Sequence, residues 1–326
     1  ITLASDIAAI AHCNTINGTL TIYGTNLTNL AGLENLAFVT GFVQIEENDA
    51  LVQIDGLSGF KNVGGDLYLG SNVVLDNIEG LAALESVGGD FTLFSNSALK
   101  NVQGLSELIQ VGNGFIIQKN NAIGTLDGLS TLSNVNGNFS IASNDSLTNV
   151  DGLIGLVTVV GWLGISNPLL CNVDGLSSLT AVGGLILQEN DCLANLDGLS
   201  ALTDIGSLYL YDNPSLSDID GLSNLAAATD ITVRHNDQVT NVDAFANLVS
   251  LNGYLKIEQN DALVDIGGLS SITTVNGTLA LGYNGAFDDL TSLTNLTSVG
   301  DLVLGDGIKS LSGLENLTTA TGDVRI

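Results

Sequence analysis

The stretch GDLYLGSNVVLDNIEGLAALESV, residues 65–87, holds one full copy of the repeat that decides how this chain folds. A second copy, GNFSIASNDSLTNVDGLIGLVTV, covers residues 137–159. Apart from conservative replacements, both follow the frame G-x-L-x-[LI]-x-x-N-x-x-L-x-x-[VIL]-D-G-L-x-x-L-x-x-[VI]. The Asn of this frame recurs throughout the chain, at Asn48, Asn72, Asn96, Asn120, Asn144, Asn167, Asn190, Asn213, Asn236, Asn260 and Asn284. This nearly fixed period, about 23 to 24 residues, is typical of a solenoid.

The spacing of apolar residues within the frame predicts how each coil is built. Leu67 and Leu69 are two residues apart and therefore point to one side of a strand. The apolar residues that follow, at steps of three, turn inward from short extended or 3₁₀-like segments. One coil buries too little apolar surface to be stable alone, so the coils must stack. We therefore predict a mainly β, right-handed, single-chain solenoid in which each coil takes about 23 to 24 residues.

The domain organisation follows from the extent of the repeat. We expect an N-terminal cap over residues 1–17, with a short helix that Ser5 or Asp6 N-caps and whose Ile7 and Ile10 cover the first coil. Residues 18–326 then form one continuous solenoid of about thirteen coils. The chain ends in Gly-Asp-Val-Arg-Ile (322–326), which predicts a further strand without a cap.

Composition excludes several classes of function. Of the 326 residues, 35 are Asp or Glu and seven are Lys or Arg, so the net charge is 7 − 35 = −28. This charge disfavours nucleic acid and anionic membranes as partners. No apolar run approaches the roughly 20 residues that span a bilayer, and the start lacks the basic segment of a signal peptide. The start at Ile1 and the lack of Met fit a processed or partial chain.

Two polar columns run through the repeat. We expect the recurring Asn to hydrogen-bond the corner backbone and the Asn of the next coil. The Asp of the D-G-L element is expected to cap its turn by accepting N–H groups two or three residues further on. Stacked carboxylates repel one another, so raised pKa values or bound cations such as Ca²⁺ are the alternatives, although the sequence contains no recognised calcium-loop motif. The candidate cation ligands are Asp151, Asp174, Asp197 and Asp220.

The frame resembles the leucine-rich repeats of the receptor L-domain kind, found in insulin and EGF receptor ectodomains and in lipid-anchored fungal cell-wall proteins. The opening carries the most specific part of the resemblance, which runs through Ser5, Asp6, Ile7, Cys13, Ile16, Gly18, Leu20 and Ile22. The family pairs the cysteine at Cys13 with an upstream cysteine, which is absent here. The resemblance implies extracellular recognition, adhesion or wall architecture, and no catalysis.

A solenoid usually presents its ligand surface on the outward positions of its main strand. Aromatic and basic residues gather there, and the candidate ligand-binding residues are Trp162, Tyr209, Tyr211, Arg234, His235, Lys256 and Glu258. Aromatic rings with a few charges suit a sugar or a protein partner. The alternative interpretation is that aromatic residues simply suit strands.

Three smaller features complete the set of hypotheses. Candidate N-glycosylation sites are Asn17, Asn26, Asn138, Asn276, Asn295 and Asn316, whereas Asn144 belongs to the inward column and is a poor acceptor. A disulfide between Cys171 and Cys192 is one alternative, although an ideal solenoid would hold their Cα atoms near or beyond the usual limit of about 7 Å. Paired carboxylates such as Glu189 and Asp212 could serve glycan chemistry.

These observations favour a non-enzymatic extracellular or cell-surface module that binds a protein or glycan partner on its principal strand face. The alternative is a structural subunit that associates through the open C-terminal edge, with cations assisting. A polysaccharide-acting enzyme is the third hypothesis. No cofactor is expected apart from Ca²⁺.

Overall fold

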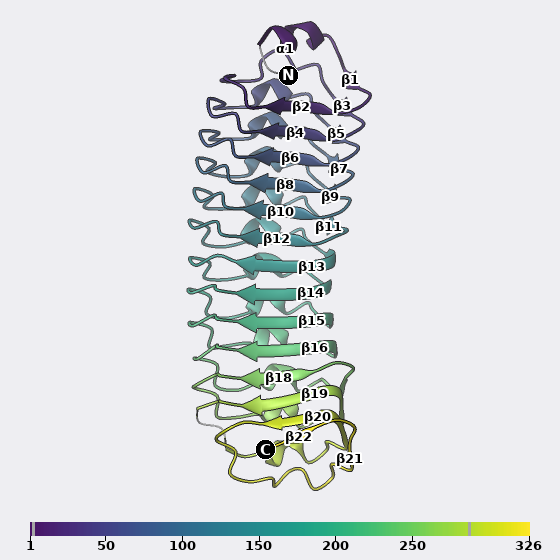
Figure 1. Ribbon diagram of the computed structural model, residues 1–326, viewed down its shortest axis with the longest axis vertical. Coiled ribbons are helices and arrows are strands. Elements are labelled where there is room, and N and C mark those ends of the chain that lie inside the picture. Colours follow the sequence, from purple (N-terminus) through teal and green to yellow (C-terminus); the bar gives the residue numbers. More distant parts are fainter. Residues whose placement is uncertain (2–3, 286–287) are drawn as a thin grey trace. The chain divides into compact units, whose positions relative to one another are not determined.

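The computed structural model describes residues 1, 4–285 and 288–326, which form two compact units, Ile1–Leu169 and Leu170–Ile326. Each unit winds through successive coils, and each coil places its strand beside the equivalent strand of the next (Figure 1). The predicted mainly β solenoid is confirmed within each unit. The assignment of residues 18–326 to one continuous array stays a prediction.

The first unit opens with the helix α1 (Ala4–Ile10), whose Ile7 is buried. The helix begins at Ala4, so Ser5 and Asp6 lie in its first turn, and the prediction that one of them is the N-cap is wrong. Each following coil contributes a two-residue strand and a four-residue strand. The strands are β1 (Thr15–Ile16), β2 (Leu20–Tyr23), β3 (Phe38–Val39), β4 (Val43–Glu46), β5 (Asn62–Val63), β6 (Leu67–Gly70), β7 (Ser86–Val87), β8 (Phe91–Phe94), β9 (Gln110–Val111), β10 (Phe115–Gln118), β11 (Asn134–Val135), β12 (Phe139–Ala142) and the merged β13 (Thr158–Ser166).

The second unit repeats this pattern, and in most of its coils the two strands merge into one. Its strands are β14 (Ala181–Gln188), β15 (Asp204–Tyr211), β16 (Ala227–Arg234), β17 (Ser250–Leu251), β18 (Leu255–Glu258), β19 (Thr274–Gly282), β20 (Ser298–Leu304), β21 (Thr319–Ala320) and β22 (Val324–Arg325). All pairings are parallel. Leu208 of β15 aligns with Leu185 of β14 and with Ile231 of β16, which hold the same frame position one coil earlier and one coil later.

Short 3₁₀ helices form where the sequence predicts steps of three. They are η1 (Asp55–Leu57), η2 (Glu79–Leu81), η3 (Gln103–Leu105), η4 (Asp127–Leu129), η5 (Asp151–Leu153), η6 (Asp174–Leu176), η7 (Asp197–Leu199), η8 (Asp220–Leu222), η9 (Asp243–Phe245), η10 (Gly267–Leu269) and η11 (Thr291–Leu293). The central Gly of these elements is required for close approach. A Cβ on Gly152 would lie 1.8 Å from the carbonyl oxygen of Leu126, whereas its φ is not in the left-handed region. This Gly is therefore explained by close packing of neighbouring coils.

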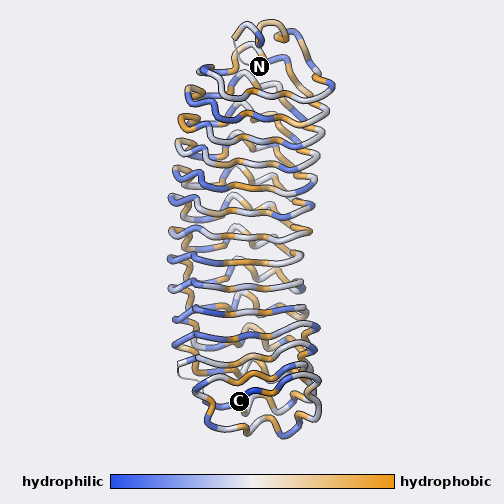
Figure 2. The backbone as a smooth tube through the Cα atoms, viewed as in Figure 1, coloured by the Kyte–Doolittle hydropathy of each residue, from blue (hydrophilic) through white to orange (hydrophobic). Residues whose placement is uncertain are grey.

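The core runs along the inside of the coils and consists of the predicted apolar positions, which alternate with hydrophilic residues along each turn (Figure 2). Leu67 and Leu69 of β6 are fully buried, and the same holds for the equivalent residues of neighbouring coils. Phe91, Phe115 and Phe139 occupy one such column and stack with ring centroids 4.8 Å apart. That distance matches the spacing of paired strands, about 4.8 Å, so successive rings are in van der Waals contact along the column.

In most coils the main strand is followed by one residue in the left-handed conformation, which directly precedes the recurring Asn. In ten coils this residue is not Gly, and its φ lies between 50° and 58°. The residues are Glu47, Ser71, Ser95, Lys119 and Ser143 in the first unit and Glu189, Asp212, His235, Gln259 and Tyr283 in the second. This turn directs the following Asn side chain into the interior, where it is buried in every coil.

The buried Asn side chains form a hydrogen-bonded ladder within each unit, as the sequence predicts. Oδ1 of Asn120 accepts the backbone N–H of Asn96 at 3.0 Å and its side-chain amide at 3.3 Å. Nδ2 of Asn120 donates to the carbonyl oxygens of Leu93 at 2.9 Å and of Gln118 at 3.1 Å. One side chain thus satisfies backbone groups in its own coil and in the preceding one, where no water can replace it.

We expect Asn120→Ala to lower the free energy of unfolding by roughly 2–5 kcal/mol, because it removes the buried hydrogen bonds of this side chain with the Asn96 N–H and with the carbonyls of Leu93 and Gln118. Chemical denaturation measures the change. The control is Asn121→Ala, the same substitution one residue further on at an exposed position. Equal stability of the two variants would contradict a supporting role for the ladder.

Candidate functional site

The strand face of the second unit brings most of the predicted ligand-binding residues together. The parallel register aligns Tyr209, Thr232 and Lys256 in one row across β15, β16 and β18. A second row, two residues further along, contains Tyr211, Arg234 and Glu258. Successive coils place these side chains about 4.8 Å apart, so neighbouring residues within a row can contact one another.

Three tyrosines form a cluster on this face. The rings of Tyr209 and Tyr211 stack with centroids 5.7 Å apart and an interplanar angle of 13°. The ring of Tyr254 lies 6.5 Å from that of Tyr209, tilted by 39°. The hydroxyl groups of Tyr209 and Tyr254 are hydrogen-bonded to each other. Burial is the main cause that raises the pKa of Tyr254, and its hydrogen bond with Tyr209 adds to the effect. The Tyr254 hydroxyl therefore keeps its proton throughout the physiological range.

Two cations lie beside these rings. Lys256 Nζ stands 4.4 Å from the centroid of the Tyr254 ring, a cation–π contact. Arg234 Nε donates to Oε1 of Gln259 at 2.5 Å. We refer to Tyr209, Tyr211, Arg234, Tyr254 and Lys256 as the tyrosine face.

The cations of the tyrosine face differ from most others in the chain. Four of the seven basic side chains form ion pairs, which are Lys61 with Glu85, Lys100 with Asp76, Lys309 with Asp288 and Arg325 with Asp323. In the part of the chain that the structure describes, Arg234, Lys256 and Lys119 form none. Lys119 instead lies 5.2 Å from the Phe94 ring centroid, on the strand face of the first unit. The cations without ion pairs therefore all lie on strand faces, beside aromatic or amide groups.

The remaining predicted residues have other positions. His235 is the left-handed residue before Asn236, and its backbone N–H donates to the carbonyl of Gln259 at 3.0 Å. Glu258 is half-buried at the end of β18. Trp162 belongs to β13 of the first unit, where its backbone N–H donates to Asn138 Oδ1 at 2.9 Å. Trp162 is therefore not assigned to the tyrosine face.

Sequence reasoning did not select Asp230 or Thr232. Asp230 Oδ1 accepts the backbone N–H of Tyr254 at 2.9 Å, and its Oδ2 accepts the Ser207 hydroxyl at 3.1 Å. Thr232 has the outward position between Tyr209 and Lys256, yet only 2% of it is exposed. The two-residue alternation of β16, which places residues 230, 232 and 234 on one face, is the signal that could have found them.

The first unit has a depression on its own strand face. It has a volume of about 460 Å³ and is lined by Phe42, Gln44, Asp66, Leu67, Tyr68, Asp90 and Thr92. Burial, followed by the charge of Glu46, raises the pKa of the Tyr68 hydroxyl. Asp66 and Asp90 each use Oδ1 to accept a backbone N–H of the next coil, at 2.9 and 2.7 Å. These carboxylates thus hold neighbouring coils together.

The Asp column has a different local geometry from the predicted one. The D-G-L Asp does not cap its turn through its side chain; the residue two positions earlier does. Asn149 Oδ1 accepts the N–H of Asp151 at 3.1 Å, and Asp218 Oδ1 accepts that of Asp220 at 2.8 Å. Asn172 and Asn195 do the same for Asp174 and Asp197. The D-G-L carboxylates therefore project into solvent.

One carboxylate of this column, that of Asp220, has a shifted pKa. Partial burial, followed by the charges of Asp218, Asp243 and Asp197, raises the pKa of Asp220. Burial is the larger cause, and repulsion by neighbouring carboxylates adds to it. Within residues 1, 4–285 and 288–326, no group of three or more His, Cys, Asp or Glu side chains is arranged to hold a metal ion. Cation binding by the Asp column therefore stays a prediction.

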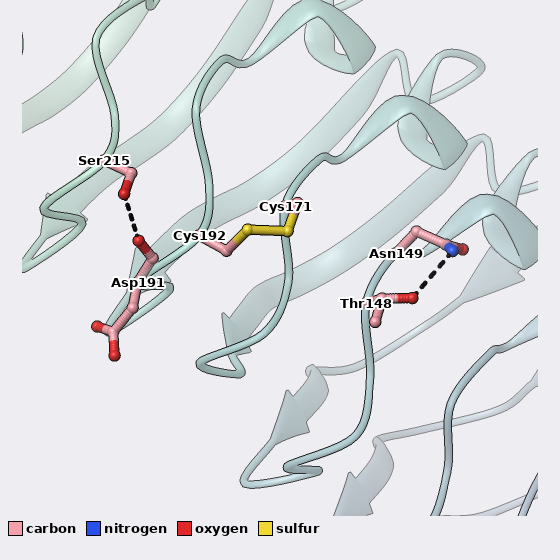
Figure 3. Close-up of a disulfide and its surroundings, with 6 residues drawn as sticks. All are labelled: Thr148, Asn149, Cys171, Asp191, Cys192 and Ser215. Atoms are coloured by element: carbon pink, nitrogen blue, oxygen red, sulfur yellow. Dashed lines mark hydrogen bonds between the residues drawn. A yellow bond between two sulfur atoms is a disulfide. The ribbon is translucent and has the colours of Figure 1, made fainter.

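Cys171 and Cys192 form a disulfide in the second unit (Figure 3). Their Cα atoms lie 4.5 Å apart, so the wider separation expected of an ideal solenoid is wrong here. The register pairs Cys171 with Ala194, whose N–H donates to the Cys171 carbonyl at 3.4 Å. Cys192 lies two residues earlier, in the turn closed by the bond from Leu193 N–H to Asn190 O, and this turn brings it back toward Cys171. Cys13 is a free, half-buried thiol.

Replacing both Cys171 and Cys192 by Ser should lower the free energy of unfolding by about 3 kcal/mol, because the bridge closes a loop with a sequence separation of 21 residues. Chemical denaturation measures the loss. Cys13→Ser, the matched control at the free thiol, should change stability little. A wild-type unfolding midpoint that does not shift on reduction would contradict a stabilising disulfide.

The candidate glycosylation sites are all exposed, whereas Asn144 is fully buried in the ladder. Three of the exposed amides already donate to backbone carbonyls or to a neighbouring amide, those of Asn276, Asn295 and Asn316. Modification of Asn17, Asn26, Asn138, Asn276, Asn295 and Asn316 stays a prediction. The poor acceptor quality predicted for Asn144 agrees with its burial.

The carboxylates considered for catalysis have a simple backbone role. Glu189 and Asp212 are the left-handed residues of adjacent coils, and both are exposed. Their N–H groups donate to the carbonyls of Tyr211 and Arg234 in the next coil. Their proximity thus follows from the repeat itself.

Parallel strands, a short 3₁₀ helix in most coils and an interior Asn ladder define a leucine-rich-repeat solenoid. Scans against known families and curated proteins find no match. Solved structures give weak likenesses. A Listeria monocytogenes internalin (inlF) is 20% identical over 83% of this chain and 84% of its own, with a TM-score of 0.41. A Leptospira interrogans leucine-rich-repeat protein is 14% identical over 98% of both chains, with a TM-score of 0.27.

A third solved structure, TLR13 in complex with ssRNA13, is 14% identical with a TM-score of 0.27, and the match covers 95% of this chain and 55% of the TLR13 chain. Among the described residues, no helix is both long and hydrophobic enough to cross a bilayer.

Proposed function

We propose that this protein is a non-catalytic recognition module that binds a protein or glycan partner through the tyrosine face. The observation that carries the proposal is the grouping of stacked tyrosines with Arg234 and Lys256, two cations that form no ion pair among the described residues. Tyrosine and arginine dominate binding energies at interfaces, because they offer large contact areas with polar ends.

An extracellular or cell-surface setting is part of the proposal. The Cys171–Cys192 disulfide supports it, because disulfides persist in oxidising compartments. The exposed sequons are compatible with such a setting. Binding also fits the chemistry of the face better than catalysis does, since the candidate carboxylates Glu189 and Asp212 serve as backbone corners.

We expect Tyr211→Ala with Arg234→Ala to weaken binding at least tenfold to any ligand found on a printed panel of polysaccharides and purified ectodomains. The reason is the loss of one aromatic contact and one guanidinium, each typical of an interface anchor. Surface plasmon resonance then measures the affinity. The control variant is Tyr23→Ala with Arg325→Ala, the same residue types outside the tyrosine face, and it should bind like the wild type. A wild type that binds no panel member, or a double variant with unchanged affinity, would refute the proposal.

Self-association through the C-terminal edge is the second candidate function. It is supported by apolar side chains that stay exposed in the last coil, namely Leu311 at 46%, Val324 at 53% and Ile326 at 74%. An exposed strand over apolar residues is a template for pairing with another chain. The large negative charge opposes association, so bound cations would assist it.

Sedimentation velocity over a range of concentrations, with Ca²⁺ or with chelator, tests this second candidate. Association should increase with concentration and with Ca²⁺, and Val324→Lys should abolish it, because an added charge at an edge blocks pairing. A monomer at all concentrations, unaffected by chelator, would exclude both the association and the role of cations.

A further inference from the structure

Thr232 is the buried side chain for which the fold provides no partner. It is 2% exposed, and its Oγ1 makes no hydrogen bond, the one such buried side-chain oxygen or nitrogen in the described part of the chain. By contrast, the buried Thr25 bonds through Oγ1 to Asn48 at 2.7 Å. A buried hydroxyl without a partner is destabilising, so its presence on a candidate binding face requires an explanation.

The cover over Thr232 comes from residues of the tyrosine face. Strand β16 lies between β15 and β18, and Thr232 is flanked in register by Tyr209 and Lys256. The hydrogen bond between the Tyr209 and Tyr254 hydroxyls joins β15 to the residue before β18 and therefore crosses over β16. Thr232 is thus flanked by side chains of the two neighbouring coils, and the bonded pair of tyrosine hydroxyls spans its strand.

The neighbouring polar group is held rigidly. Both carboxylate oxygens of Asp230 have partners, the Tyr254 backbone N–H and the Ser207 hydroxyl. Asp230 fixes the backbone at Tyr254, and so the start of β18, relative to β16. The movable part of the enclosure is therefore the pair of tyrosine hydroxyls.

The backbone beneath this enclosure is not open to a peptide strand. The central residues of β16 pair with β15 on one side and with β18 on the other, so strand addition, which needs free N–H and C=O groups, cannot occur here. Recognition must therefore use side-chain groups. The groups available here are two tyrosine hydroxyls, one threonine hydroxyl and the aromatic rings. From Asp230 onward, the outward positions of β16 and β18 carry two carboxylates, Asp230 and Glu258, and two cations, Arg234 and Lys256, so the local charge balances.

We propose that this enclosure is a binding site for a neutral sugar ring. A sugar hydroxyl enters between Tyr209 and Tyr254, replaces their mutual hydrogen bond, and bonds to Thr232 Oγ1. A hydroxyl suits this position because it both donates and accepts, as the three protein hydroxyls do. The apolar face of the ring packs on the stacked pair of Tyr209 and Tyr211. This inference rests on the proposed recognition function and names its ligand class.

The test uses the full chain with neutral hexasaccharides of the cello, chito, manno and laminari series, and with hexagalacturonate as the acidic comparator. The wild type should bind at least one neutral series in titration calorimetry. Thr232→Val should raise the melting temperature of the free protein, because it removes an unsatisfied hydroxyl at constant shape, and should weaken sugar binding at least tenfold. Tyr254→Phe should weaken binding as well.

The matched control is Thr278→Val on β19, whose hydroxyl bonds to Asp301 at 3.1 Å. It should lower the melting temperature and leave sugar affinity unchanged. Unchanged affinity of Thr232→Val, or binding of hexagalacturonate alone, overturns the sugar site. A wild type that binds an ectodomain through the tyrosine face but no neutral sugar overturns this inference while the proposed function stands.

Discussion

The interior amide ladder is the interaction on which the other features of each unit depend. A solenoid coil must turn sharply at the end of its main strand, and this turn leaves backbone N–H and C=O groups pointing inward. Apolar side chains cannot satisfy them. Asn can, because its side chain carries a donor and an acceptor, and Nδ2 and Oδ1 of Asn120 bond to groups of its own and the preceding coil. The left-handed residue before ten of these Asn residues is accepted because it aims the amide inward.

The ladder also determines what the outer surface can do. It locks the register, so side chains at equivalent positions lie in rows one coil apart, as the Phe91, Phe115 and Phe139 stack shows inside the core. Outside, the same rows bring Tyr209, Thr232 and Lys256 together. The strands that form these rows use their backbone groups in pairing. Any ligand of this face is therefore recognised by side chains. Its specificity comes from the different side chains that successive coils place at equivalent outward positions.

Much of this could be predicted from the sequence, because the regular period of the repeat fixes both the coil and its interior. The positions of Asn120, Leu67 and Gly152 all follow from the frame. Features that depend on the exact geometry of the turns could not be predicted in the same way. Cys192 reaches Cys171 because a local turn shifts it by two residues from its register partner. A 3₁₀ turn is capped by the side chain two residues before the D-G-L Asp, as in Asn149 and Asp218. This side chain precedes the turn, so its oxygen can accept the N–H of the D-G-L Asp.

The tyrosine face is the hardest part to predict, because it depends on side-chain conformations across coils. Alternation along β16 shows that Thr232 points outward, yet its burial results from Tyr209 and Tyr254 meeting over the strand. The distribution of charge follows a similar logic. In a chain with 35 acidic residues, a cation finds a carboxylate easily, and four of the seven cations do. Arg234 and Lys256 lie instead against an amide and a ring. These contacts leave N–H donors of both side chains unused, so both keep hydrogen-bonding capacity for an incoming group.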